Sequence, residues 1–209
     1  VARSTIGIDL HSAAINRSNL PQLRLEQGDT ELLKLAKIFA PPLVLTSELR
    51  EGSLRESAKE SDTKILLYEA GEGLRFDEFA IRVGVTGILR VMHHLGMVAR
   101  KGISEPKTAP IVSSVSHWLR APAGGLLRTY RTNGDFIKEG ELLGVVADPF
   151  GEPILQVRTA VDDTTSKLAE GGAAAIEAKL GERACRQPNE RSSFVDAQAG
   201  SGFSHVDPS

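Results

Sequence analysis

The stretch Ile6-Gly7-Ile8-Asp9-Leu10-His11-Ser12-Ala13 decides the fold, because its apolar run ends abruptly in a carboxylate and an imidazole. The run predicts a buried strand over residues 4–10, whose alternate side chains point to opposite faces. Asp9 and His11 then share one face, where the carboxylate can orient the imidazole ring or accept its second N–H. This arrangement suits metal ligation by His11, and the alternative is a histidine satisfied by hydrogen bonds at a strand end.

The composition indicates a globular protein and excludes several classes of partner. Apolar residues make up 41% of the 209 residues and charged residues 25%, which are ordinary values for a globular chain. The net charge of −2 gives no electrostatic support for binding to nucleic acid or to an anionic membrane. The single Cys185 rules out an internal disulfide, and the sequence shows neither a membrane-spanning apolar run nor a signal peptide. We therefore expect a cytoplasmic location.

Strands that alternate with helices are predicted over the first hundred residues. Strands are expected at residues 43–46 and 64–69, and helices at residues 30–39, 53–59 and 76–97. Residues 16–21 are rich in Asn, Ser, Arg and Pro and predict a loop. This order favours an α/β layer with at least some parallel pairing.

The longest predicted helix has apolar residues at steps of three and four. We expect these residues to form one stripe that faces the core, namely Ile81, Val85, Ile88, Met92 and Leu95. Gly84 and Gly87 weaken the helix locally and predict that a neighbouring group packs close to it there.

The pattern changes at about residue 100, so we expect three regions. Residues 1–100 form the α/β region. Residues 101–160 consist of short apolar runs separated by turns that contain Gly, Asn, Asp and Pro, which is typical of a small all-β domain. Residues 161–209 lose this pattern and end in a polar stretch with few aliphatic residues, which predicts a divergent, flexible tail.

Two predicted strands end in chemically useful side chains, His11 and Glu69. In open α/β sheets, ligands bind in the crevice beyond the carboxyl ends of the strands. A catalytic zinc ion needs three protein ligands and an open position for water, and a nearby carboxylate can take the proton of that water. The alternative for Glu69 is a strand-end carboxylate in a salt bridge. Arg50 and Arg55 are expected to be solvated, with orientation toward the site as the lesser alternative.

Five segments follow one another in a characteristic order. They are Asp9-Leu10-His11-Ser12-Ala13, Asn16-Arg17-Ser18-Asn19-Leu20-Pro21, Ser53-Leu54-Arg55-Glu56, Glu69-Ala70-Gly71-Glu72 and His94-Leu95-Gly96-Met97. This order resembles the succinylglutamate desuccinylase/aspartoacylase family, which is related to the zinc carboxypeptidases. Residues 121–127 and 143–151 resemble that family's C-terminal domain, so the resemblance extends from residue 4 to residue 158. It implies a partial, zinc-carboxypeptidase-like mixed sheet with helices, followed by a small all-β domain.

The resemblance also implies a zinc-dependent hydrolase, a deacylase that cleaves an N-acyl amide or ester of a small acylated amino acid or a similar acid. His11 matches the family's zinc ligand, and Glu69 matches the general base that activates zinc-bound water. Asp9 is expected to orient the His11 ring or to accept its second N–H, without binding the metal itself. Arg17 and Asn19 are expected to reach the substrate, with hydrogen bonding inside their loop as an equal alternative.

The family's other two zinc ligands belong to a Gly-x-His-Gly-x-Glu motif upstream of the Asp-Leu-His strand, and the sequence has no match to it. We therefore expect the C-terminal portion of an enzyme with one zinc site, whose remaining ligands lie upstream of Val1. The alternative is a non-catalytic α/β plus β module that acts through protein contacts. The sequence leaves open whether the chain assembles into a homo-oligomer.

Overall fold

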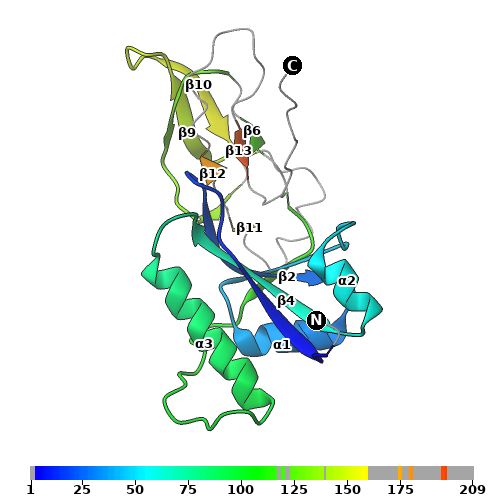
Figure 1. The fold of residues 1–209 in the computed structure, drawn as a ribbon. Helices are drawn as coiled ribbons and strands as arrows, with labels where there is room; N and C mark the ends of the chain where they lie inside the picture. Colours follow the sequence, from blue (N-terminus) through cyan, green and yellow to red (C-terminus); the bar gives the residue numbers. More distant parts are fainter. Residues whose placement is uncertain are drawn as a thin grey trace.

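The chain folds into a mixed sheet with helices followed by a smaller antiparallel sheet (Figure 1). The computed structural model describes residues 3–116, 119–120, 123–138, 140–159, 174–175, 179–180 and 194–196. The arrangement confirms the predicted α/β fold with a small β part after it. Among the described residues, no helix is both long enough and apolar enough to cross a bilayer.

The mixed sheet has five strands in the order β1-β4-β2-β3-β5. The strands are β1 (Ile6–His11), β2 (Ser18–Glu26), β3 (Leu43–Ser47), β4 (Lys64–Glu72) and β5 (Ile111–Ser113). The pairs β1–β4, β2–β3 and β3–β5 are parallel, whereas β2 runs antiparallel to β4. The accompanying helices are α1 (Thr30–Phe39), α2 (Leu54–Glu60) and α3 (Glu78–His94).

The smaller sheet has the order β10-β9-β7 and is antiparallel throughout. Its strands are β7 (Leu126–Thr129), β9 (Leu142–Ala147) and β10 (Pro153–Arg158). Short strands accompany it, namely β6 (Leu119–Arg120), β8 (Phe136–Ile137), β11 (Ala174–Ala175), β12 (Lys179–Leu180) and β13 (Phe194–Asp196). Apart from β11, β12 and β13, the predicted tail lies outside the described residues, and the division into three regions stays a prediction.

Strand β5 lies in the five-stranded sheet, although its sequence pattern predicted that it would belong to the small all-β domain. Ile111 pairs with Leu43 and Ser113 with Leu45, in parallel register. Three residues are too few for a sequence pattern to show which sheet a strand joins, so the partner is set by tertiary contacts.

Helix α1 has the predicted bounds, and a side chain fixes its start. The Oδ1 atom of Asp29 accepts hydrogen bonds from the backbone N–H groups of Glu31 and Leu32, at 3.0 and 2.9 Å. These bonds satisfy two of the N–H groups that a helix leaves unpaired at its N-terminus. The helix ends at Ala40, which adopts a left-handed conformation with φ 56°.

The predicted loop over residues 16–21 is wrong from Ser18 onward, because β2 begins there. Pro21 concealed the strand, since proline cannot donate a hydrogen bond to a β-ladder. In the structure the register of β2 against β4 shifts between Asn19 and Gln22, and Pro21 sits inside that irregularity. A bulge of this kind accommodates proline within a paired strand.

The apolar sequence of β1 predicts a buried strand, and this prediction is wrong. The strand is half-buried and lies at an edge of the sheet. Ile6 and Ile8 pack against the core cluster, and Leu10 is exposed. An edge strand has a neighbour on only one side, so apolar side chains near its outer border receive less cover.

The predicted core-facing stripe of α3 is wrong for most of its residues, although Ile88 does pack against the core cluster. Ile81, Val85 and Leu95 are 42%, 52% and 41% exposed. The buried face is offset by one residue, which rotates it by about 100°. It consists of the small residues Ala80, Gly84 and Gly87 together with Val91.

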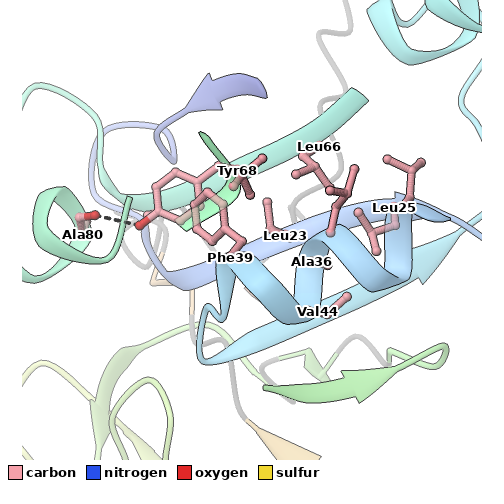
Figure 2. Packing of buried hydrophobic residues seen from close by; sticks show 12 residues of the cluster. Leu23, Leu25, Ala36, Phe39, Val44, Leu66, Tyr68 and Ala80 are labelled. Atoms are coloured by element: carbon pink, nitrogen blue, oxygen red, sulfur yellow. Dashed lines mark hydrogen bonds between the residues drawn. The ribbon is translucent and has the colours of Figure 1, made fainter. Parts of the chain in front are cut away.

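Two aromatic rings explain why small residues face inward on α3 (Figure 2). A Cβ on Gly87 would lie 2.2 Å from Cε1 of Phe39, and a Cβ on Gly84 would lie 2.9 Å from Cε1 of Tyr68. The close approach predicted at these glycines is therefore confirmed. The Tyr68 hydroxyl donates to the carbonyl oxygen of Ala80 at 2.6 Å, and burial raises the pKa of Tyr68.

We expect Gly87→Ala to lower the free energy of unfolding by about 1–3 kcal/mol, because the new methyl group overlaps the Phe39 ring. Urea denaturation followed by circular dichroism measures this. Gly124→Ala is the control, since a Cβ there meets no atom within 4 Å. A more stable Gly87→Ala protein would contradict the contact, because alanine's helix propensity alone stabilises by up to about 1 kcal/mol.

A second prediction concerns Asp29, whose carboxylate also contacts Nζ of Lys64 at 2.7 Å. Burial acts to raise the pKa of Asp29, but hydrogen bonds from Leu32 and Lys64 outweigh it and hold the pKa below its ordinary value. A lowered folded-state pKa stabilises the fold above the unfolded-state pKa of about 4, and this stabilisation is lost as the pH falls through the folded-state pKa.

Asp29→Asn keeps a capping oxygen and removes the charge. We expect its loss of stability relative to wild type to be full above about pH 4 and to shrink toward pH 2. Urea denaturation at pH 7, 5 and 3 measures it, with the exposed Glu51→Gln as control. A stability difference that is the same at every pH would contradict the role given to the Asp29 charge.

Candidate active site on the polar face of the sheet

The five-stranded sheet has one apolar face, and its opposite face carries charged side chains on β1, β4 and β2 beside buried leucines of β3. This second face is called the polar face below. Leu23, Leu25, Leu66 and Tyr68 belong to the core cluster that α1 and α3 cover. The residues between them point the other way, because side chains alternate along a strand. The strand register places these polar-face residues in two rows across β1, β4 and β2. The rows are His11–Glu69–Gln22 and Asp9–Leu67–Arg24.

The first row places the two residues expected to carry the chemistry side by side. His11 and Glu69 are register partners in parallel strands, so their side chains leave the same face on strands about 5 Å apart. His11 is exposed, whereas Glu69 is buried. Both residues lie near the carboxyl ends of their strands, where ligands of α/β sheets bind.

Asp9 lies on the same strand as His11, two residues back. Its Oδ2 atom is 3.1 Å from Nε2 of the His11 ring. When Nε2–H donates to this carboxylate, Nδ1 becomes the ring nitrogen with a free lone pair. The pair can therefore present one oriented imidazole donor to a ligand.

Glu69 forms a buried ion pair with a residue that the sequence did not single out. The Nε atom of Arg24 donates to Oε2 of Glu69 at 2.8 Å, and the two side chains are only 9% and 11% exposed. Glu69 therefore makes the salt bridge considered as its alternative role. The two roles are compatible, because Oε1 lies outside this contact. Arg24 was missed because β2 itself was missed.

Arg55 faces the site from α2 and is not solvated as expected. Burial lowers the pKa of Arg55 and the charge of Arg24 lowers it further, whereas Glu69, Asp9 and Glu26 act to raise it. Its Nε and Nη1 atoms are buried and have no hydrogen-bond partner among the described residues. Arg55 is thus a cation next to the Arg24–Glu69 pair, and it has hydrogen-bond donors available for a ligand.

Arg17 and Asn19 differ in their surroundings. Asn19 lies in β2 opposite Gly71, is 2% exposed, and has neither Oδ1 nor Nδ2 bonded to any described residue. Hydrogen bonding inside the loop does not account for its side chain. Arg17 is half-buried, and its backbone N–H donates to the carbonyl oxygen of Ala14 at 3.1 Å.

The donor set of this chain does not by itself suffice for the implied zinc ion. In the described part of the chain, no three side chains of His, Cys, Asp or Glu come together to hold a metal. His11 offers one imidazole, and one oxygen of Glu69 is occupied by Arg24. A catalytic zinc needs three protein ligands, so two more donors would be required besides His11.

Other polar residues have structural partners. Asp77 caps α3 by accepting from the N–H groups of Phe79 and Ala80, and Nδ1 of His93 lies 3.0 Å from the carbonyl oxygen of Val98. These contacts fix the start of α3 and tie its last turn to the segment that follows it. His117 and His205 lie outside the described residues.

Comparisons with known proteins agree with the fold and the motif order. Residues 1–95 match the family described as Succinylglutamate desuccinylase/Aspartoacylase catalytic domain. These residues are therefore similar to a catalytic domain of a family that is named for deacylases. The resemblance to the succinylglutamate desuccinylase/aspartoacylase family that the motif order predicts is thereby confirmed over these residues. No curated protein matches the chain significantly.

Solved structures show the same fold. The succinylglutamate desuccinylase/aspartoacylase from Rhodobacter sphaeroides is 21% identical, with a TM-score of 0.61 over 75% of this chain and 51% of that chain. The product-bound ectoine utilization protein EutE (DoeB) from Ruegeria pomeroyi is 17% identical, with a TM-score of 0.63 over 81% of this chain and 51% of that chain. The chain thus spans about half the length of these proteins.

We expect Arg24→Met and Glu69→Met each to lower the free energy of unfolding by about 3–5 kcal/mol, because each leaves a buried charge without its partner. The double variant should lose less than the sum of the two. Urea denaturation of all four proteins measures the coupling. In the exposed pair Lys59–Glu26, Lys59→Met should cost at most about 1 kcal/mol. Additive losses at Arg24 and Glu69 would contradict the ion pair.

Proposed function

We propose that this chain carries part of the active site of a zinc-dependent deacylase. The reaction is hydrolysis of an N-acyl amide or ester of a small acylated amino acid or a similar acid. The observation that supports it best is the register of His11 with Glu69, which puts an imidazole and a carboxylate side by side on one polar face. The family of residues 1–95 supports the reaction class.

In this proposal Glu69 is the general base. Its Oε2 is held by Arg24, so Oε1 is left to take a proton from the attacking water and to pass it to the leaving group. His11, oriented by Asp9, supplies one ligand for zinc. The other two ligands of one zinc site are expected upstream of this sequence.

Arg55 is proposed to bind the carboxylate of the substrate. Its buried Nε and Nη1 donors lack partners among the described residues, and guanidinium groups pair well with carboxylates. The amide of Asn19, in the same strand as Arg24, has no partner among the described residues, and with Arg17 it is proposed to contact the rest of the substrate. The product-bound EutE structure shows that a protein with this fold holds a small molecule.

A non-catalytic module that acts through protein contacts is the second candidate. It is favoured by the lack of a three-ligand cluster among the described residues. Leu74 and Phe76, which follow β4, are also 90% and 96% exposed. Exposed large apolar side chains are a feature of protein-binding surfaces.

The test uses the longest natural polypeptide that contains this sequence. We expect about one zinc per chain by elemental analysis, in keeping with a single three-ligand site. Glu69→Gln should lower the hydrolysis of N-acyl amino acids by at least about 100-fold, because the base is lost. Zinc should be retained, because His11 is unchanged and the amide oxygen can still accept a hydrogen bond from Arg24. His11→Ala should lower the zinc content.

Glu78→Gln is the matched control, since Glu78 is an exposed acid in the first turn of α3. It should leave both zinc content and turnover unchanged. Unchanged turnover in Glu69→Gln would remove Glu69 from the mechanism. A natural polypeptide that neither binds zinc nor hydrolyses any acylated amino acid would favour the non-catalytic module.

A further inference from the structure

We infer that Arg24 is a positioning residue for Glu69. The guanidinium of Arg24 fixes the carboxylate of Glu69 so that its Oε1 atom is presented to the substrate. The inference rests on the proposed role of Glu69 as the base. It concerns a residue on β2, the strand that the sequence pattern concealed.

The sheet register brings the two side chains together diagonally. Gln22 is the direct partner of Glu69, and Arg24 is the partner of Leu67, one step further along the same face. Diagonal neighbours of this kind have Cα atoms roughly 7–8 Å apart, within reach of long side chains. The contact is made through Nε, which lies closer to the backbone than the terminal nitrogens, so the guanidinium has little freedom to swing away.

The backbone on both sides of the contact is firmly anchored. Arg24 stands between Leu23 and Leu25, which are fully buried on the opposite face. Glu69 stands between Tyr68 and Ala70, which are also buried there. Because both strands are held by their apolar faces, the two polar side chains have a fixed separation, and their ion pair selects one orientation of the carboxylate.

The two guanidinium groups at the site differ in what they contact. Arg24 is bonded to Glu69, whereas the Nε and Nη1 atoms of Arg55 have no described partner. A buried ion pair is often no more stabilising than two apolar side chains of similar size. What it supplies here is orientation, because one hydrogen bond holds Oε2 and leaves Oε1 on the other side of the carboxylate.

The kinetic test compares Arg24→Gln and Arg24→Lys with wild type in the longest natural polypeptide. Misplacement of a reacting group by about 1 Å can cost about 100-fold in rate, so we expect kcat to fall about 10–100-fold in Arg24→Gln. KM should stay within about threefold, since substrate contacts are intact. Arg24→Lys should be intermediate, because an ammonium keeps the charge but not the planar geometry.

A structural test on the 209-residue chain is independent of turnover. The NMR order parameter of the Glu69 side chain should be high in wild type and fall in Arg24→Gln, with Arg24→Lys in between. The control is Arg82→Gln, because Arg82 is exposed on α3. If Arg24→Gln does not fold, Arg24→Lys gives the decisive comparison.

The possible outcomes separate this inference from the function on which it rests. Full turnover in Glu69→Gln overturns the proposed base and this inference with it. Inactive Glu69→Gln together with wild-type kcat in both Arg24 variants overturns the positioning role alone. A rise in KM with unchanged kcat also overturns it, because Arg24 would then bind substrate. An unchanged Glu69 order parameter in the Arg24 variants overturns it regardless of activity.

Discussion

The antiparallel pairing of β2 with β4 is the interaction on which the rest of the structure depends. It sends Leu23 and Leu25 into the core beneath α1 and α3. It sends the intervening Arg24 to the opposite face, where its guanidinium meets Glu69. Because the side-chain period of a strand is two, a slip by one residue would exchange these faces and bury a charge in the apolar core. One register therefore determines both the packing of the domain and the chemistry of the site.

The apolar face places its own demand on the sequence. The rings of Phe39 and Tyr68 lie with their centroids 5.3 Å apart, and α3 passes over them with glycine where a larger side chain would collide. Glycine weakens a helix, and this cost is offset by the contact of aromatic surface with the helix backbone. Packing on the apolar face thus stabilises the sheet. The polar face can therefore carry charged side chains that contribute to the chemistry of the site.

The sequence predicted those parts of the fold in which local and tertiary preferences agree. Helix α1 begins after the Asp29 cap and ends at Phe39, as its pattern indicates, and the family resemblance is confirmed over residues 1–95. Prediction failed where a tertiary contact outweighed the local pattern. A bulge accommodates Pro21 within β2, and two rings turn the glycine side of α3 inward. Arg24 was missed because Pro21 concealed β2, and an arginine in a presumed loop has no defined neighbour. The roles of His11 and Glu69 stay predictions that their placement supports.

The central claim is that Arg24 and Glu69 meet on the polar face beside His11. The most direct measurement is an NMR spectrum of the 209-residue chain with labelled arginine and glutamate side chains. The account predicts a strong nuclear Overhauser effect between Hε of Arg24 and the γ-protons of Glu69, and slow exchange of that Hε with water. Rapid exchange of the Arg24 Hε, with no cross-peak to Glu69, would contradict it.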